Sequence, residues 1–147
     1  MPAPRVVLDT VVLVSAFITE HKRGVSAELL RLATAGRFEV YASEAILAET
    51  RRVLLEDRRH LRRRYRYGEA AVRQWCEALS DLVLMVTNPP AVRAVERDPD
   101  DDIVIACALG ARAELIVTRD KDLLVLERYQ GIRMVTPETF LAELRAA

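Results

Sequence analysis

Short groups of acidic residues stand at four places along this 147-residue chain. They are Asp9, Glu49, the run from Asp98 to Asp102, and Asp120 with Asp122. Carboxylates that a fold gathers at one place repel one another unless a divalent cation neutralises them. That cation can then activate a water molecule. The acids therefore predict a metal site, provided that the fold brings them to one edge.

The elements around these acids alternate between strands and helices. We expect strands at 6–8, 38–42, 82–86, 115–118 and 132–135. We expect helices at 25–35, 103–113 and 122–128, one helix that begins after Ser43, a further helix that ends at about residue 80, and a last helix after Thr136. Short, continuous apolar strands are typical of a parallel sheet that is covered on both faces, so the chain is predicted to be a three-layer α/β/α fold with a central, mostly parallel sheet of about five strands. Ligands of such sheets bind beyond the carboxyl ends of the strands. Asp9 and Asp120 each follow a predicted strand.

Length and composition predict one domain that spans residues 1–147. Apolar runs fall short of the ~18 residues that a membrane span needs. Asp9 interrupts the N-terminal apolar segment too early for a secretory signal, so we expect a cytoplasmic protein. Cys76 and Cys107 have no metal-ligand spacing and are predicted to be buried, reduced thiols.

Each acid alone has a simpler explanation. Asp9 and Asp120 could cap helices, and Glu49 could be a solvated helix residue, although apolar neighbours favour a partly buried position. Asp98 and Asp100 are interpreted as loop charges. Asp101 and Asp102 open a helix, and Asp102 is preferred because an apolar segment follows it.

Four segments, in this order, carry a family resemblance: Val-Val-Leu-Asp9-Thr10, Ser43-Glu-Ala-Ile-Leu-Ala-Glu49, Asp-Pro-Asp-Asp-Asp102 and Ile-Val-Thr118-Arg-Asp120-Lys-Asp122. Together they resemble the PIN domain and, more narrowly, the VapC-like ribonucleases that are the toxin components of toxin–antitoxin pairs. The resemblance covers nearly the whole chain. It implies an endoribonuclease that depends on Mg²⁺ or Mn²⁺, a cognate antitoxin protein as partner, and a homodimer.

The resemblance also implies the site residues. The catalytic and metal-binding acids are Asp9, Glu49, Asp102 and Asp120, with Asp101 and Asp122 as outer candidates and Thr10 and Thr118 in supporting positions. Oxygen ligands suit the hard cations Mg²⁺ and Mn²⁺. The two histidines, His21 and His60, are too few and too poorly placed to favour a histidine-based ribonuclease.

Val11 departs from the family pattern, which commonly has asparagine two residues after the first aspartate. The alternative function is therefore a catalytically impaired binding module that acts through a protein partner or RNA. Val11 also argues against haloacid-dehalogenase phosphatases and exonucleases with an Asp-Glu-Asp-Asp set, because both need an acid there. A dinucleotide-binding fold is disfavoured because no GxGxxG follows the first strand.

A basic segment balances the acids, so that the net charge is zero. Its eight arginines are candidates for contacts with RNA phosphates: Arg51, Arg52, Arg58, Arg59, Arg62, Arg63, Arg64 and Arg66. Tyr65 and Tyr67 beside them could stack on unpaired bases. Two other uses stay open, namely a solvated helix face and a docking surface for an acidic antitoxin segment.

Overall fold

The computed structural model of the chain describes residues 2–56, 60–92 and 99–147, without the side chains of residues 99–101. Within these ranges the strands form a six-stranded sheet of order β3-β2-β1-β4-β6-β5. All neighbours pair in parallel except β5 and β6, which are antiparallel. The strands are β1 Arg5–Leu8, β2 Glu39–Ala42, β3 Leu84–Met85, β4 Leu115–Val117, β5 Arg128–Tyr129 and β6 Ile132–Val135. The predicted α/β class with a mostly parallel sheet is confirmed.

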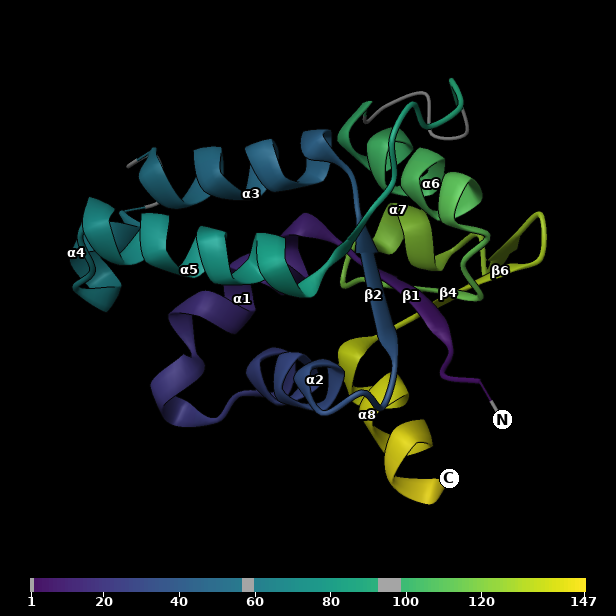
Figure 1. Ribbon diagram of the computed structural model, residues 1–147, viewed down its shortest axis with the longest axis horizontal. Coiled ribbons are helices and arrows are strands. Elements are labelled where there is room, and N and C mark those ends of the chain that lie inside the picture. Colours follow the sequence, from purple (N-terminus) through teal and green to yellow (C-terminus); the bar gives the residue numbers. More distant parts are fainter. Residues whose placement is uncertain (1, 57–59, 93–98) are drawn as a thin grey trace.

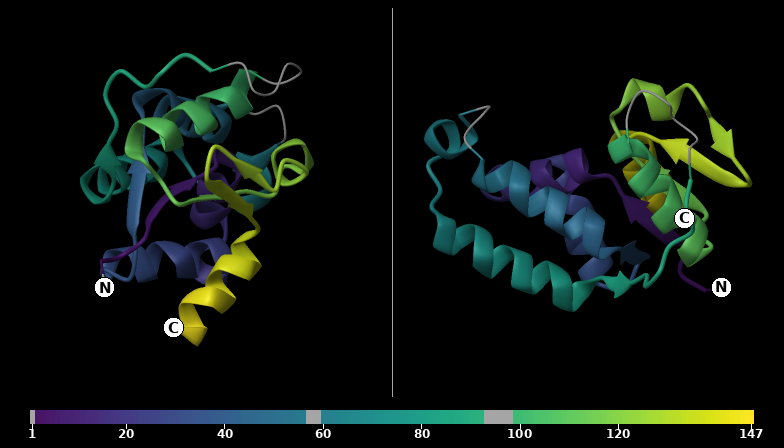
Figure 2. Two further views of the ribbon diagram at one scale, coloured as in Figure 1. Left: turned by 90° about the vertical axis from the view of Figure 1, so that its right-hand side faces the viewer. Right: turned by 90° about the horizontal axis from the view of Figure 1, so that it is seen from above.

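Helices cover both faces of this sheet. They are α1 Thr10–Ile18, the 3₁₀ turn η1 Glu20–Lys22, α2 Val25–Thr34, α3 Glu44–Leu55, α4 Leu61–Tyr65, α5 Glu69–Leu82, α6 Pro99–Ala111, α7 Lys121–Leu124 and α8 Pro137–Ala146. Figure 1 and the left view of Figure 2 show α6 on one face of the sheet, and α2 and α8 on the other. In the described part of the chain, no helix is long and apolar enough to cross a membrane.

A pair of helices, α3 and α5, extends away from the sheet and ends at α4 (Figures 1 and 2). This helical arm has a small apolar cluster of its own, formed by the buried residues Val14, Leu54 and Val72. Phe17 and Trp75 pack against the cluster, with their ring centroids 5.3 Å apart. The arm is therefore fixed to α1 by this second cluster, and Trp75 also packs against the core around the sheet.

The predicted helix starts at Ser43 and Thr136 are confirmed. Ser43 caps α3 by accepting a hydrogen bond from the backbone nitrogen of Ile46 at 3.3 Å. Thr136 caps α8 in the same way through the nitrogen of Thr139 at 3.1 Å, and Pro137 occupies the first turn. Both caps satisfy backbone donors that have no partner within the helix.

Two of the predicted element boundaries were wrong, and one segment left open is now assigned. Leu82 ends α5 and does not begin a strand, because its side chain belongs to the apolar face of that helix. The helix expected at 122–128 is the short α7, and Arg128 begins β5. The segment after Asp9, left open as a turn or helix start, is helical from Thr10 to Ile18.

Apolar residues of the inner strands fill the core. Val6, Val7, Ile116 and Val117 have no exposed surface, as expected for strands with helices on both faces. Both cysteines are free thiols: Cys107 is buried in α6 and Cys76 is half-buried in α5. Burial raises the pKa of the Cys107 thiol to about 12, although a hydrogen bond with Ser43 opposes part of this effect.

Candidate active site

Asp9 lies at the carboxyl end of β1, directly before α1. Parallel pairing sets Leu8 beside Val117 of β4, and the Asp9 nitrogen donates to the Val117 carbonyl at 2.9 Å. The Asp9 side chain is only 5% exposed, and its Oδ1 accepts a hydrogen bond from the Thr10 nitrogen at 2.7 Å. The expected capping role is therefore present. Burial of a carboxylate is costly, however, and capping alone does not require it.

Thr118 links the end of β4 to Asp9. Its hydroxyl donates to Oδ2 of Asp9 at 2.6 Å and accepts from the backbone nitrogen of Asp120 at 2.9 Å. Thr118 has no exposed surface, and in the described part of the chain these two hydrogen bonds orient its hydroxyl. The structure thus brings Asp9, Thr118 and Asp120 together at the carboxyl edge of two adjacent strands.

Asp120 and Asp122 lie at the start of α7. Oδ1 of Asp120 accepts a hydrogen bond from the Asp122 nitrogen at 2.8 Å, so Asp120 caps this short helix. Asp120 is half-buried, whereas Asp122 is exposed. Asp120 therefore belongs to the same hydrogen-bonded group as Thr118, and Asp122 lies at its outer side.

Glu49 lies in the middle of α3, and its side chain is 19% exposed. Arg52, one turn further along the helix, donates from Nε to Oε2 at 2.9 Å and from Nη2 to Oε1 at 2.5 Å. This hydrogen-bonded guanidinium lowers the pKa of the Glu49 carboxyl, against a smaller opposing effect of burial. Glu49 is thus ionised and held by Arg52.

Asp102 is half-buried in the first turns of α6, a helix that packs on β1, β2 and β4. Helix α6 also contacts α3, which carries Glu49. The side chains of Asp100 and Asp101, and all of Asp98, lie outside the described residues. The backbone of Asp100 lies in the first turn of α6, which begins at Pro99, so its interpretation as a loop charge was wrong. The roles predicted for Asp98 and Asp101 stay predictions.

Residues 5–122 match the family model of the PIN domain (PIN_3). This match covers most of the 147 residues. The chain belongs to the PIN domain family. PIN domains are typically nucleases and generally use divalent metal ions. The comparison with curated proteins gave no match.

The donor chemistry at the carboxyl edge fits the divalent ions that PIN nucleases use. Asp9 offers a buried carboxylate, and the backbone of Asp120, a second acid, is hydrogen-bonded to the same Thr118 hydroxyl. Carboxylates supply the oxygen ligands that Mg²⁺ and Mn²⁺ prefer. A carboxylate has about four lone-pair sites, so single hydrogen bonds to its oxygens leave room for a cation. In the parts that the structure describes, no group of three or more His, Cys, Asp or Glu side chains is arranged to hold a metal.

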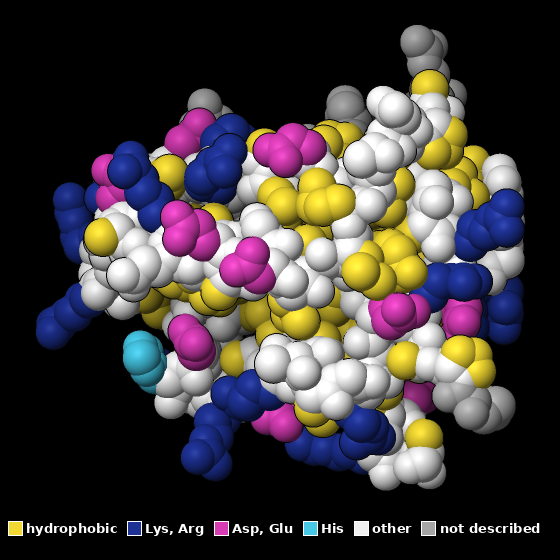
Figure 3. All heavy atoms as spheres, viewed as in Figure 1, with side chains coloured by type: hydrophobic (Ala, Val, Ile, Leu, Met, Phe, Trp, Pro, Cys, Tyr) yellow, Lys and Arg dark blue, Asp and Glu magenta, His cyan; other side chains and the backbone are white. Residues whose placement is uncertain are grey.

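The basic segment of this PIN domain is divided between two elements. Arg51 and Arg52 are exposed on α3, whereas Arg62, Arg63, Arg64 and Arg66 belong to α4 and its end; Arg58 and Arg59 lie outside the described residues. Figures 1 and 2 place α4 at the tip of the helical arm, and Figure 3 shows Lys and Arg side chains gathered at that end. The guanidinium of Arg64 lies 5.4 Å from the centre of the Tyr65 ring.

The predicted stacking role of Tyr67 was wrong. Its hydroxyl donates to the Leu54 carbonyl at 2.7 Å, and its ring packs edge-on against Phe17 with the centroids 5.0 Å apart. Tyr67 therefore joins the helical arm to α1, and both its hydroxyl and its ring are engaged within the protein. Tyr65 stays a candidate for stacking.

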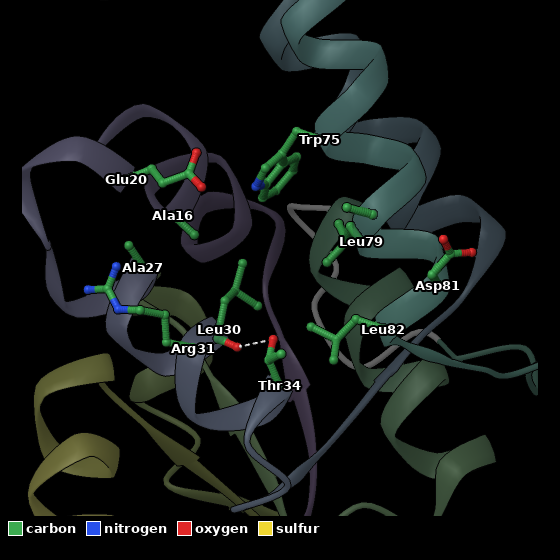
Figure 4. Close-up of a pocket in the computed structure, with 11 residues that line it drawn as sticks. Ala16, Glu20, Ala27, Leu30, Arg31, Thr34, Trp75, Leu79, Asp81 and Leu82 are labelled. Carbon is green, nitrogen blue, oxygen red and sulfur yellow. Dashed lines mark hydrogen bonds between the residues drawn. The ribbon is translucent and has the colours of Figure 1, made fainter.

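A groove between α2 and α5, with a volume of about 540 Å³, was not anticipated from the sequence. Figure 3 shows hydrophobic side chains along this strip, and Figure 4 shows Leu30 of α2 opposite Trp75 and Leu79 of α5. Two acids, Glu20 and Asp81, lie at its rim. The amphipathic pattern of α5, with Trp75 between Val72 and Leu79, was the available signal, but it does not tell which helix faces this side.

Proposed function

We propose that this PIN-domain protein is a metal-dependent endoribonuclease that hydrolyses RNA phosphodiester bonds, and that it is the toxin of a toxin–antitoxin pair in the cytoplasm. The observation that carries the proposal is the buried carboxylate of Asp9, which the Thr118 hydroxyl joins to Asp120 at the carboxyl edge of the sheet. Ligands of parallel α/β sheets bind at this edge. A buried carboxylate at this edge, with the backbone of a second acid hydrogen-bonded to the same threonine, is suited to a cation.

In this proposal Asp9, Glu49, Asp102 and Asp120 would hold Mg²⁺ or Mn²⁺. The bound ion would lower the pKa of a water molecule and offset the charge that develops on the phosphate. Thr118 fixes the rotamer of Asp9 through its hydrogen bond to Oδ2, and the Thr10 nitrogen fixes the other oxygen. The Asp9 carboxylate at the ends of β1 and β4 is therefore preorganised before RNA arrives.

The arginines of α4 are proposed to bind RNA phosphates. Such contacts provide affinity without sequence information, and the affinity falls as salt rises. Tyr65, with Arg64 against its ring, offers a stacking surface for an unpaired base. Arg52 fits this role less well because its guanidinium is engaged with Glu49 and Glu56.

A cognate antitoxin protein is the proposed partner, and a homodimer is the proposed assembly. The groove between α2 and α5 supports a protein partner, because its floor is apolar and its volume suits several side chains. The two rim acids, Glu20 and Asp81, would favour a segment with Lys or Arg beside its apolar residues. This differs from the acidic segment that the arginines alone would favour.

The alternative is a PIN-fold binding module with impaired catalysis. Val11, which is 45% exposed at the start of α1, gives the reason, because it offers no polar atom next to Asp9. Retention of Asp9, Glu49, Asp102 and Asp120 favours the enzyme.

Cleavage of a mixed RNA pool tests the proposal. The wild type is assayed with excess Mg²⁺ or Mn²⁺ and with EDTA, beside Asp9→Asn and Asp102→Asn. Both substitutions are expected to lower the rate by more than about 100-fold, since changes to groups behind metal ligands already cost about 10- to 100-fold. Glu114→Gln is the matched control, because this exposed acid precedes β4 at the opposite edge of the sheet. Equal inertness of the wild type and both Asn variants would refute the nuclease and leave the binding module.

A further inference from the structure

Arg52 lies between two acids of helix α3. Its Nε and Nη2 donate to both oxygens of Glu49, and its Nη1 donates to Oε2 of Glu56 at 2.7 Å. The paired contact with Glu49 is the planar fork that a guanidinium makes with a carboxylate. Arg52 itself is 45% exposed, whereas Glu49 is only 19% exposed. The arginine therefore closes over the acid from the solvent side.

This contact affects any cation that approaches Glu49. A guanidinium and a divalent metal are both positive, and they compete for the same carboxylate oxygens. Unlike the neutral donors on Asp9, the guanidinium of Arg52 carries a positive charge that repels a cation, so metal binding at Glu49 is favoured when Arg52 turns away. Glu56 makes this change easier, because Arg52 keeps a charged partner when it leaves Glu49.

We propose that Arg52 is a positioning residue of the metal site, which holds Glu49 while no metal is bound and thereby lowers the apparent affinity for the metal. Glu56 shares Arg52 and weakens this hold. The inference rests on the proposed function, since it takes Glu49 as a metal ligand. It adds to the proposed metal ligands a contact that regulates one of them, Glu49.

The contact predicts effects of opposite sign for changes to Arg52 and to its second partner, Glu56. Arg52→Ala is expected to tighten Mn²⁺ binding by about twofold to fivefold, which is the range of partly exposed ion pairs. Arg52→Lys keeps the charge but loses the fork, so it is expected to fall between the wild type and the alanine variant. Glu56→Gln is expected to weaken Mn²⁺ binding up to about twofold, and only while Arg52 is present.

The experiment measures Mn²⁺ binding by the full chain without RNA, from the electron paramagnetic resonance signal of free Mn²⁺. Arg51→Ala is the matched control, because it removes one positive charge from the adjacent exposed position of the same helix. A double-mutant cycle with Glu49→Gln separates the direct contact from the general effect of charge. Circular dichroism verifies that each variant is folded.

The inference is supported if Arg52→Ala binds Mn²⁺ more tightly than Arg51→Ala and if this gain disappears in the Glu49→Gln background. It is overturned if the two arginine variants bind equally, or if the gain persists without the Glu49 carboxylate. Binding by Arg52→Ala but not by the wild type would support it strongly. Absence of Mn²⁺ binding in both would overturn the proposed metal site, and the role of Arg52 with it.

Discussion

Replacing Thr118 by valine tests the hydrogen bonds that organise the candidate site. Valine keeps the shape of threonine but removes the hydroxyl, which donates to Oδ2 of Asp9 at 2.6 Å and accepts from the Asp120 nitrogen at 2.9 Å. A hydrogen bond to a charged group contributes about 1.5–3 kcal/mol, and a buried donor without an acceptor costs about 1–3 kcal/mol. Asp9 is 5% exposed, so water compensates little. We expect Thr118→Val to lower the free energy of unfolding by about 3 kcal/mol.

The assay is urea unfolding, followed by circular dichroism at pH 7 with EDTA, so that bound metal does not contribute to stability. For a chain of this size the melting temperature is expected to fall by roughly 10 °C. Thr118→Ser is the control: it keeps the hydroxyl, loses one methyl group and is expected to cost only about 1 kcal/mol.

A double-mutant cycle with Asp9→Asn tests the charged half of the contact. In the Asn background, loss of the Thr118 hydroxyl is expected to cost about 1–2 kcal/mol less, because the acceptor is then neutral. The reasoning is refuted if Thr118→Val costs less than about 0.5 kcal/mol, or if serine is as harmful as valine.

Three further predictions concern other contacts. Tyr67→Phe removes the hydrogen bond to the Leu54 carbonyl and is expected to lower the free energy of unfolding by about 1 kcal/mol in urea, whereas Tyr65→Phe is expected to change it by less than about 0.5 kcal/mol; equal effects would contradict the anchoring role of Tyr67. Burial raises the pKa of the Cys107 thiol to about 12, so the thiol stays protonated in the folded state, whereas in the unfolded chain it ionises near its ordinary pKa of 9.0. The free energy of unfolding is therefore expected to fall as pH rises above 9.0, by up to about 1.4 kcal/mol per pH unit. Urea titrations at pH 8, 9 and 10 are expected to show a shallower fall for Cys107→Ala, and identical slopes would contradict the burial effect. If RNA binds α4, alanine at positions 62–64 is expected to reduce the slope of log affinity against log salt by about 2 for single-stranded RNA, and an unchanged slope would exclude these arginines from the RNA surface.

Local patterns in the sequence were enough to predict most of the sheet. The apolar runs at β1 and β4 are continuous and rich in β-branched residues, β6 is apolar except for Arg133, and helix caps such as Ser43 mark where the chain turns. The signal gave the two-residue strand β3 only within a longer predicted strand at 82–86, and it missed the two-residue strand β5. The hairpin between β5 and β6 did have a local sequence signal, the glycine at position 131. In the structure Gln130 and Gly131 both adopt positive φ, of 47° and 85°.

The contacts of the candidate site also fall into two kinds: local contacts, which sequence spacing can reveal, and long-range contacts, which it cannot. The Arg52 contacts with Glu49 and Glu56 are three and four residues apart on one helix, so helical spacing was sufficient to find them. The contact between Thr118 and Asp9 joins residues 109 apart and depends on β1 lying beside β4. Strand order is not encoded in the period of either strand.

The sequence by itself determined which elements form, which of their faces are apolar, and which acids stand at their ends. Tertiary structure decided which acids meet: Asp9 joins Asp120 through Thr118, whereas Glu49 is held by Arg52. It also decided that Tyr67 packs on Phe17 and that α2 and α5 leave a groove. The physical reason is that local periodicity and caps arise from contacts between near neighbours. Side-chain convergence depends instead on how all strands and helices pack at once.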